Sequence, residues 1–272
     1  MGFIDQLSGI YGVILDMDGV LWKDSAPIGD LSCIFEQLRA RQLKIILATN
    51  NSTRTVDQYL EKLFSFGVRL EPEQIVSSAM TAGYYLKNRF PQGGFVYVVG
   101  EQSLKLTLQT YGFQAVEQLD EDYPQDDQIL AVVAAMDRAL SYDKLRRAAL
   151  LIRKGVPFIG TNPDQTFPTP QGLVPGAGSI LAALETATSV KPLIMGKPAP
   201  YLFELSISRM GIQSNEALVV GDRLDTDIAG GQRARCRTAI VLSGVTSLAE
   251  AQSWQPAPDL IVPDLASLIF ET

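Results

Sequence analysis

Short apolar runs alternate with helical hydrophobic periodicity along this chain, and the alternation restricts the fold more than any other feature. Four runs, at residues 12–15, 45–48, 217–220 and 239–242, are apolar at consecutive positions. Such runs are typical of parallel strands that helices cover on both faces. Between them, helical spacing connects Leu31, Ile34, Phe35 and Leu38, and also Val56, Tyr59, Leu60 and Leu63. The pattern predicts an α/β sheet.

The middle of the chain has strand and helix candidates of its own and is predicted to form a separate unit. Its strand candidates cover residues 95–99, 129–134 and 156–159. A helix candidate places Leu145, Ala148, Ala149 and Ile152 on one face. We place the boundaries near residues 80 and 187, and we expect the acidic stretch 120–127 to be a solvent-exposed loop.

Composition excludes several classes of function. The 272 residues include no histidine, so a Ser-His-Asp or Cys-His nucleophile and histidine-bound zinc are ruled out. The formal net charge of −7 opposes binding to nucleic acid, which needs clustered Lys and Arg. A small phosphorylated metabolite is not excluded, because a bound cation and one lysine can reverse the sign inside a cleft.

The sequence favours a cytoplasmic protein with no membrane partner. No apolar stretch approaches the roughly 18 residues that span a bilayer. Residues 1–11 carry Asp5 and no basic residue, so we expect no signal peptide. Cys33 and Cys236 lack C-x-x-C spacing and are predicted to be buried, reduced thiols.

Two acids follow the first strand candidate. In an open α/β sheet, ligands bind beyond the carboxyl ends of the strands. Asp16, at the end of the apolar run, could attack phosphorus beside a metal ion. Asp18, next to the turn residue Gly19, could protonate the leaving oxygen and later deprotonate water. The alternative is an Asp-rich turn with a capping role.

Small polar residues follow the second strand candidate, and a lysine stands alone in a later loop. Hydroxyl and N–H groups of the segment 49–52 could hold phosphoryl oxygens, although by itself this segment favours a helix N-cap. Lys197, between Gly196 and Pro198, could bridge nucleophile and phosphate. The alternative is an ordinary exposed lysine.

Three acids follow the third strand candidate. Magnesium prefers hard oxygen ligands and keeps several waters, so one or two carboxylates suffice. Asp222, at the strand end, is the natural ligand, and Asp227 could orient a metal-bound water. Asp225 and Asp227 could instead be favourable charges at a helix N-terminus, which we prefer for Asp225. The argument is the coincidence of polar residues at several strand ends.

In order along the chain, these segments resemble the four motifs of the haloacid dehalogenase-like phosphatase superfamily. The flanking residues Leu21-Trp22 and Pro198 are similar to its class IIA branch, as are the segments 137–138 and 175–179 and Tyr142. That branch includes p-nitrophenyl, phosphoglycolate, pyridoxal phosphate and UMP phosphatases. The resemblance covers essentially the whole chain.

The resemblance implies a doubly wound, mostly parallel α/β core with an inserted α/β cap domain. The core would comprise residues 1–80 and 187–272, and the cap residues 81–186. Asp16 would be the nucleophile and Asp18 the general acid and base. Mg²⁺ would be held by Asp16, the backbone carbonyl of Asp18 and Asp222, with Asp227 in support. The phosphate would be bound by Thr49, Asn50, Asn51 and Lys197.

The leading hypothesis is a Mg²⁺-dependent phosphatase of small phosphomonoesters that forms an aspartyl phosphate on Asp16. Asp18 argues against dehalogenation, which needs no acid at that position. A mononucleotide 5′-phosphatase with the same mechanism and a non-catalytic phospho-ligand-binding protein remain alternatives. The resemblance also leaves open a homodimer through the cap.

Substrate preference is not transferred from the resemblance. Many relatives have glycine at the position of Asp24, and some have a cap histidine that this chain lacks. The cap is expected to close over the site and to select the leaving group. Candidate substrate contacts, each equally well explained as a surface or turn residue, are Asp137, Arg138, Tyr142, Asn162 and Asp164.

Overall fold

The chain divides into two compact units in the computed structural model, which describes residues 3–116, 126–169 and 171–270. The first unit runs up to residue 49, resumes at 56–76 and continues from residue 197, and the second comprises residues 50–55 and 77–196. The second unit therefore extends beyond the predicted range 81–186. One reason is a two-residue strand, β12 (Leu193–Ile194), which pairs with β9 (Phe158–Gly160) of the second unit.

A six-stranded sheet forms the centre of the first unit, in the order β15-β14-β13-β1-β4-β5. The central strand β1 pairs in parallel with both β4 and β13, and parallel pairing continues through β14 to β15. The winding direction therefore reverses between β1 and β13, which confirms the predicted doubly wound sheet. The strands are β1 (Gly12–Leu15), β4 (Lys44–Thr49), β5 (Ile75–Ser77), β13 (Ala217–Gly221), β14 (Arg237–Val241) and β15 (Leu260–Val262).

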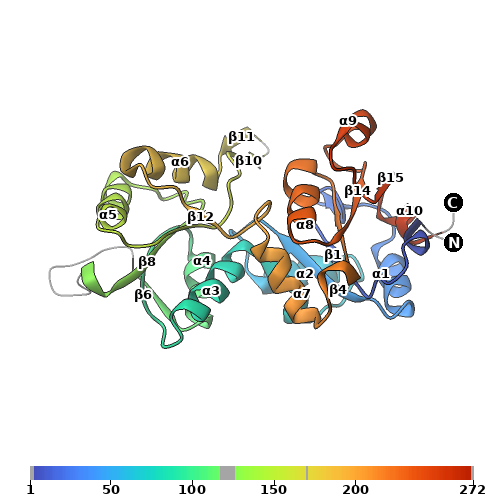
Figure 1. Cartoon of the computed structure of the whole chain (residues 1–272), viewed down its shortest axis with the longest axis horizontal. Helices are drawn as coiled ribbons and strands as arrows, with labels where there is room; N and C mark the ends of the chain where they lie inside the picture. Colours follow the sequence, from blue (N-terminus) through green and yellow to red (C-terminus); the bar gives the residue numbers. More distant parts are fainter. Residues whose placement is uncertain (1–2, 117–125, 170, 271–272) are drawn as a thin grey trace. The chain divides into compact units, whose positions relative to one another are not determined.

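Alternate residues of the buried strands face two separate hydrophobic clusters. Val13 and Leu15 pack into the cluster that includes helix α1 (Leu31–Ala40), whereas Ile14 packs into the cluster of α7 (Tyr201–Met210). Helices thus cover both faces, which explains why β1 is apolar at every position. Figure 1 shows α1 beside α10 (Leu265–Ile269), which contacts it. The other helices of this unit are α2 (Val56–Ser65), α8 (Ala229–Arg233) and α9 (Leu248–Ser253).

Shorter elements complete the first unit. The strands β2 (Trp22–Lys23) and β3 (Ala26–Pro27) form an antiparallel hairpin after β1. A π-helical turn, Leu224–Ile228, leads from β13 into α8. Turns of 3-10 helix occur at Phe3–Gln6, Pro72–Gln74 and Ser214–Glu216.

The helix α1 shows how the sequence specifies its elements locally. Asp30 accepts a hydrogen bond from the Cys33 N–H at 3.0 Å and so caps the first turn. The predicted apolar face, including Ile34 and Phe35, is buried. Both cysteines are free; Cys236 is buried as predicted, but Cys33 is only partly buried because it lies beside that face.

A second parallel sheet, in the order β12-β9-β8-β6-β7, forms the second unit. Here the winding reverses between β6 and β8. In Figure 1, α5 lies beside α6 and α3 beside α4, pairs that are also in contact. The remaining elements are β6 (Gly94–Val99), β7 (Phe113–Val116), β8 (Ile129–Ala134), α3 (Ser78–Arg89), α4 (Gln102–Thr110), α5 (Tyr142–Arg153), α6 (Ala177–Thr188), the hairpin β10 (Thr166–Thr169) and β11 (Gly172–Pro175), and a 3-10 turn at Asp126–Gln128.

Two expectations for the second unit need correction. The strand predicted at 156–159 begins at Phe158, because the Val156 N–H closes the end of α5 on the Leu151 carbonyl. In the predicted exposed loop at 120–127, residues 120–125 lie outside the described residues. Asp126 is not simply solvated, since it pairs with Arg147 and with Lys154 at 2.5 Å. Among the described residues, no helix combines the length and apolar character needed to cross a membrane.

Candidate active site

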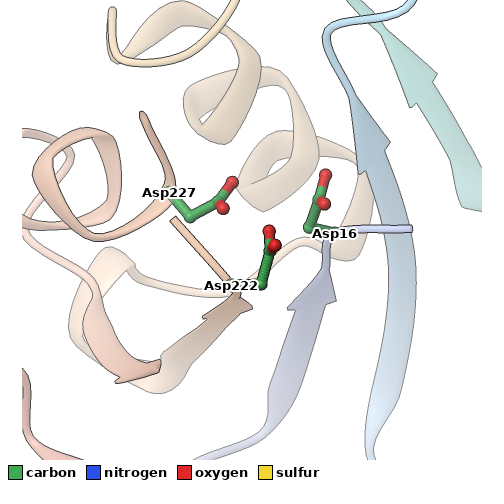
Figure 2. A group of neighbouring side chains, drawn as sticks. All are labelled: Asp16, Asp222 and Asp227. Atoms are coloured by element: carbon green, nitrogen blue, oxygen red, sulfur yellow. The ribbon is translucent and has the colours of Figure 1, made fainter. Parts of the chain in front are cut away.

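Three acids converge where the winding of the first sheet reverses. Asp16 follows β1 and Asp222 follows the adjacent strand β13, and the Asp16 N–H donates to the Val220 carbonyl at 2.9 Å. Asp227, in the π-helical turn, accepts a hydrogen bond from the Arg223 N–H at 3.1 Å. One carboxylate oxygen of each acid lies within 4.8 Å of the others. Figure 2 shows the three side chains beside one another. We call these residues the carboxylate group.

Lys197 lies inside this group. Its Nζ donates to Asp16 Oδ1, to Asp227 Oδ1 at 2.7 Å and to the Ala48 carbonyl at 3.2 Å. The residue is only 3% exposed, so the alternative of a surface lysine is wrong. The structure therefore brings together residues that lie more than 180 positions apart, since Lys197 and Asp16 are 181 residues apart.

Glycines make room for the carboxylates. A Cβ at Gly19 or Gly244 would clash with the Asp222 carboxylate, and one at Gly221 would clash with Asp227. Gly19 also has a φ of +81°, which non-glycine residues rarely adopt. These positions can therefore not accept a side chain without moving the acids.

Sequence reasoning missed the loop 243–245, which follows β14. The Val245 N–H donates to Asp222 Oδ2 at 3.0 Å, and the Ser243 hydroxyl donates to the Gly19 carbonyl at 2.7 Å. The loop thus holds both the metal-ligand candidate and the turn after the nucleophile candidate. The sequence offered at most the hydroxyl of Ser243 as a signal, because the loop contacts Asp222 through the Val245 N–H and through Gly244, which has no side chain.

The electrostatics of the carboxylate group are those of a site with excess negative charge. Burial raises the pKa of Asp16 well above its usual range, against the lowering effect of Lys197, and Asp227 and Asp222 raise it further. Burial, with Asp227 adding to it, raises the pKa of Asp222 to about 6. Burial alone would lower the pKa of Lys197, but Asp16 and Asp227 outweigh it and the pKa is raised. Lys197 therefore stays protonated.

The donor set fits a magnesium ion. Carboxylate oxygens are the hard ligands that Mg²⁺ takes. If all three acids ionise beside one ammonium, an excess of about two negative charges results, which a divalent cation would neutralise. In residues 3–116, 126–169 and 171–270, this is the one group of three or more acids, cysteines or histidines close enough to share an ion.

Asp18 is not part of the group: its side chain is exposed, although the neighbouring loop residues Met17 and Val20 are buried. Asp18 Oδ1 accepts a hydrogen bond from Trp22 Nε1 at 2.7 Å. The loop closes on itself, because the Leu21 N–H donates to the Met17 carbonyl at 2.8 Å and the Gly19 N–H to the Trp22 carbonyl at 2.7 Å. The role of its backbone carbonyl as a metal ligand stays a prediction.

The phosphate-binding candidates after β4 divide between the units. Thr49 ends β4 in the first unit and is buried, whereas Asn50 and Asn51 belong to the second. Asn50 Nδ2 donates to Asp164 Oδ2 at 3.3 Å, and Asn51 Oδ1 accepts from the Thr53 N–H at 2.9 Å. The alternative of an N-cap is wrong, because α2 begins only at Val56.

The remaining candidates are all in the second unit, and four of the five have partners within it. Asp137 is buried and pairs with Lys144 at 2.8 Å, and Arg138 pairs with Glu101. The Asn162 amide donates to the Asn50 carbonyl at 2.9 Å, and Asn162 Oδ1 accepts from the Asp164 N–H. Tyr142 is 79% exposed. Their roles in substrate contact stay predictions.

Comparisons with known proteins agree with the geometry. Residues 13–114 match the family model of haloacid dehalogenase-like hydrolases, and residues 194–268 match a related model of the same hydrolases. A chloroplastic phosphoglycolate phosphatase of Arabidopsis thaliana is 36% identical over 265 residues, which covers 92% of this chain and 73% of the relative.

Solved structures give the same picture. A glycerol phosphate phosphatase of Mycobacterium tuberculosis in complex with magnesium superposes with a TM-score of 0.88 at 33% identity, over 100% of this chain and 79% of the other. A p-nitrophenyl phosphatase of Archaeoglobus fulgidus gives a TM-score of 0.87 at 28% identity, over 96% and 98% of the two chains.

Proposed function

The chain belongs to the haloacid dehalogenase-like hydrolases, in their class IIA branch, and is a phosphomonoester hydrolase; we propose that it releases phosphate from a small metabolite through an aspartyl phosphate on Asp16. The observation that carries this proposal is that Asp16, Asp222 and Asp227 lie together at the sheet reversal, with Lys197 bonded to Asp16 and Asp227. Ligands of open α/β sheets bind at this point.

Asp16 is the nucleophile in this proposal. Its carboxylate oxygen forms a bond to phosphorus while the bond from phosphorus to the leaving oxygen breaks. Lys197 holds Asp16 through an ion pair and offsets the repulsion between the carboxylate and the incoming phosphate. Thr49, buried at the end of β4, offers a hydroxyl for a phosphoryl oxygen. Asn50 and Asn51 stay predicted phosphate ligands.

Asp18 transfers the proton at both stages. It gives its proton to the leaving alcohol and then takes one from the water that hydrolyses the aspartyl phosphate. Its exposed position on the loop after β1 suits a group that must exchange protons with substrate and water. The cycle returns Asp16 and Asp18 to their starting states.

Mg²⁺ is the cofactor, and Asp16 and Asp222 are the residues that would hold it. The Asp18 carbonyl would be a further ligand, and Asp227 would orient a metal-bound water without binding the ion itself. When bound, Mg²⁺ neutralises charge on the phosphate and on the surrounding carboxylates. The loop 243–245 keeps Asp222 in place through the Val245 N–H.

Small phosphorylated alcohols are the proposed substrate class. The relatives are named for phosphoglycolate, glycerol phosphate and p-nitrophenyl phosphate. A panel that ranks kcat/KM for these esters, mononucleotides and pyridoxal phosphate would identify the preferred class. A clear preference for mononucleotides would replace this assignment with the 5′-nucleotidase alternative.

Release of phosphate from p-nitrophenyl phosphate tests the mechanism. Asp16→Asn should lower kcat by at least about 1,000-fold, because no other group can take over nucleophilic attack. Asp225→Asn is the matched control: this nearby acid is exposed, pairs with Arg223 at 3.0 Å and should leave the rate unchanged. Equal losses in both variants would contradict the proposal. Absence of Mg²⁺-dependent turnover by the unmodified protein across the panel would favour the binding-protein alternative.

A further inference from the structure

One hydrogen bond connects a buried indole to the proposed acid and base. Trp22 Nε1 donates to Asp18 Oδ1 at 2.7 Å. Trp22 is 1% exposed, whereas the Asp18 side chain lies at the surface of the first unit. The donor is therefore fixed by packing and the acceptor is not. A single N–H engages one carboxylate oxygen, and proton transfer needs only the other.

Several contacts prevent the indole from turning. Its ring packs against Phe66 with the centroids 6.1 Å apart, and Lys62 Nζ lies 4.0 Å above its centroid. Lys62 also donates to the Asp24 carbonyl at 2.9 Å, which fixes the ammonium over the ring. The hairpin of β2 and β3 holds the Trp22 backbone opposite Pro27.

Asp18 itself lacks comparable packing. It lies on the tight turn that includes Gly19, with a φ of +81°, and its carboxyl group faces solvent. An exposed side chain of this kind samples several rotamers, and holding it in one costs conformational entropy. A preorganised donor reduces that cost at the moment of reaction.

We propose that Trp22 is the positioning residue of Asp18, and that it makes the enzyme effective on phosphate esters with poor leaving groups. The inference rests on the proposed role of Asp18 as general acid. As the bond between phosphorus and the leaving oxygen breaks, the Asp18 O–H proton moves to that oxygen. The Trp22 N–H keeps its own proton and only holds the carboxyl group in place.

The leaving group makes this role measurable. An alkoxide is strongly basic and must receive a proton as it leaves, whereas p-nitrophenolate is a stable anion and needs little help. Disordering Asp18 should therefore impair hydrolysis of alkyl phosphates much more than hydrolysis of p-nitrophenyl phosphate. A merely structural role for Trp22 would lower both rates together.

Trp22→Phe tests the proposal, because it removes the N–H and keeps an aromatic ring. We expect kcat/KM for glycerol phosphate to fall roughly 10- to 100-fold, as for loss of a hydrogen bond to a charged group. For p-nitrophenyl phosphate, the fall should stay below about 3-fold, and KM should be unchanged for both esters, because Trp22 does not bind them.

The other tryptophan supplies a matched control. Trp254 Nε1 is buried and has no hydrogen-bond partner among the described residues. Trp254→Phe therefore removes an indole N–H but leaves the hydrogen bond between Trp22 and Asp18 intact. It should change kcat/KM for neither glycerol phosphate nor p-nitrophenyl phosphate. Lys62→Met is the second variant in case Trp22→Phe unfolds: it keeps the N–H, loosens the indole, and should give the same selective loss at about 2- to 5-fold.

A double-mutant cycle separates positioning from other effects. In an Asp18→Asn background, Trp22→Phe should cause no further loss on glycerol phosphate, because the group that it positions is already disabled. An additive loss, an equal loss on both esters, or no loss on either would overturn the inference. If Asp16→Asn is inactive while Trp22→Phe shows no selectivity, only this inference fails; if Asp16→Asn remains active, the proposed function fails.

Discussion

The chain contains two parallel sheets that reverse their winding, and both place acids at the reversal. In the first unit these are Asp16 and Asp222, after β1 and β13. In the second they are Glu101 and Asp137, shortly after β6 and β8. Each sheet thus offers the location at which open α/β sheets bind ligands.

The two locations differ in charge balance. In the second unit each acid has a cation of its own: Asp137 pairs with Lys144 at 2.8 Å, and Glu101 pairs with Arg138. In the first unit three acids lie together with one lysine, Lys197, which pairs with Asp16 and Asp227. Both sheets have a reversal where a ligand could bind, but only at the first do the carboxylates outnumber the nearby cations. This excess negative charge favours binding of a divalent cation. The following predictions test this difference.

The largest effect should come from removing a carboxylate of the first reversal. Asp222→Asn should weaken Mg²⁺ activation by more than about 100-fold, since loss of groups that only orient ligands already costs 10- to 100-fold. Asp137→Asn at the second reversal should lower stability, because it leaves Lys144 without its partner, but should keep the Mg²⁺ dependence. Mg²⁺ titrations of phosphatase activity measure the Mg²⁺ dependence of both variants. A similar rise in the Mg²⁺ concentration for half-maximal activity in the two variants would contradict the proposed difference between the reversals.

A smaller effect is expected from filling the space beside Asp222. Gly244→Ala would push a Cβ into the Asp222 carboxylate, and the Mg²⁺ concentration for half-maximal activity should rise about 10-fold. Gly100 directly follows β6 at the second reversal, and in Gly100→Ala the new Cβ would meet Leu104 Cδ2 at 2.7 Å. It should lower the melting temperature and leave the Mg²⁺ requirement unchanged.

The pH dependence of Mg²⁺ stabilisation should be moderate. Because the pKa of Asp222 is about 6 in the folded protein and about 4 when unfolded, the folded state binds the proton more tightly. Without Mg²⁺, this group therefore lowers the free energy of unfolding as pH rises from 4 through 6. Bound Mg²⁺ should offset this loss of stability, because it neutralises the ionised Asp222 carboxylate. The increase in Tm on adding Mg²⁺ should therefore be roughly 3–5 °C larger at pH 7.5 than at pH 5. Thermal melts at both pH values measure it, and a larger increase at pH 5 would contradict the account.

The smallest effect on stability is expected at the exposed ion pair of the second reversal, Glu101 with Arg138. Arg138 is 71% exposed in its side chain, so Glu101→Gln should change the free energy of unfolding by less than about 1 kcal/mol. Chemical denaturation measures this, and the Mg²⁺ titration should be unaltered. A marked loss of Mg²⁺ activation would show that both reversals belong to the metal site.

From the sequence alone, site residues could be identified where they directly follow an apolar strand candidate. Asp16 and Asp222 could be found because residue type and strand end coincide. The loop 243–245 could not, because it acts through a backbone N–H and through the absent side chain of Gly244. Almost every residue type has a backbone N–H, so the sequence does not show which N–H groups contact the site. The burial of Lys197 was equally hidden, since its partners are distant in the chain.

The limits of the second unit differ from the predicted limits for a similar reason. The strand β12 has two residues, Leu193 and Ile194, too few to show a periodicity. Its membership depends on pairing with β9, a contact between distant segments. The strands with four or more consecutive apolar residues were predicted within one or two residues of their observed ends.

Trapping the covalent intermediate tests the central claim most directly. The protein is mixed with Mg²⁺ and an alkyl phosphate, quenched in acid within one turnover, digested and analysed by mass spectrometry. The account predicts phosphate on the peptide that contains Asp16, only when Mg²⁺ is present, and none in Asp16→Asn. Phosphate on a different residue, or complete turnover with no phosphorylated peptide at any time, would contradict it.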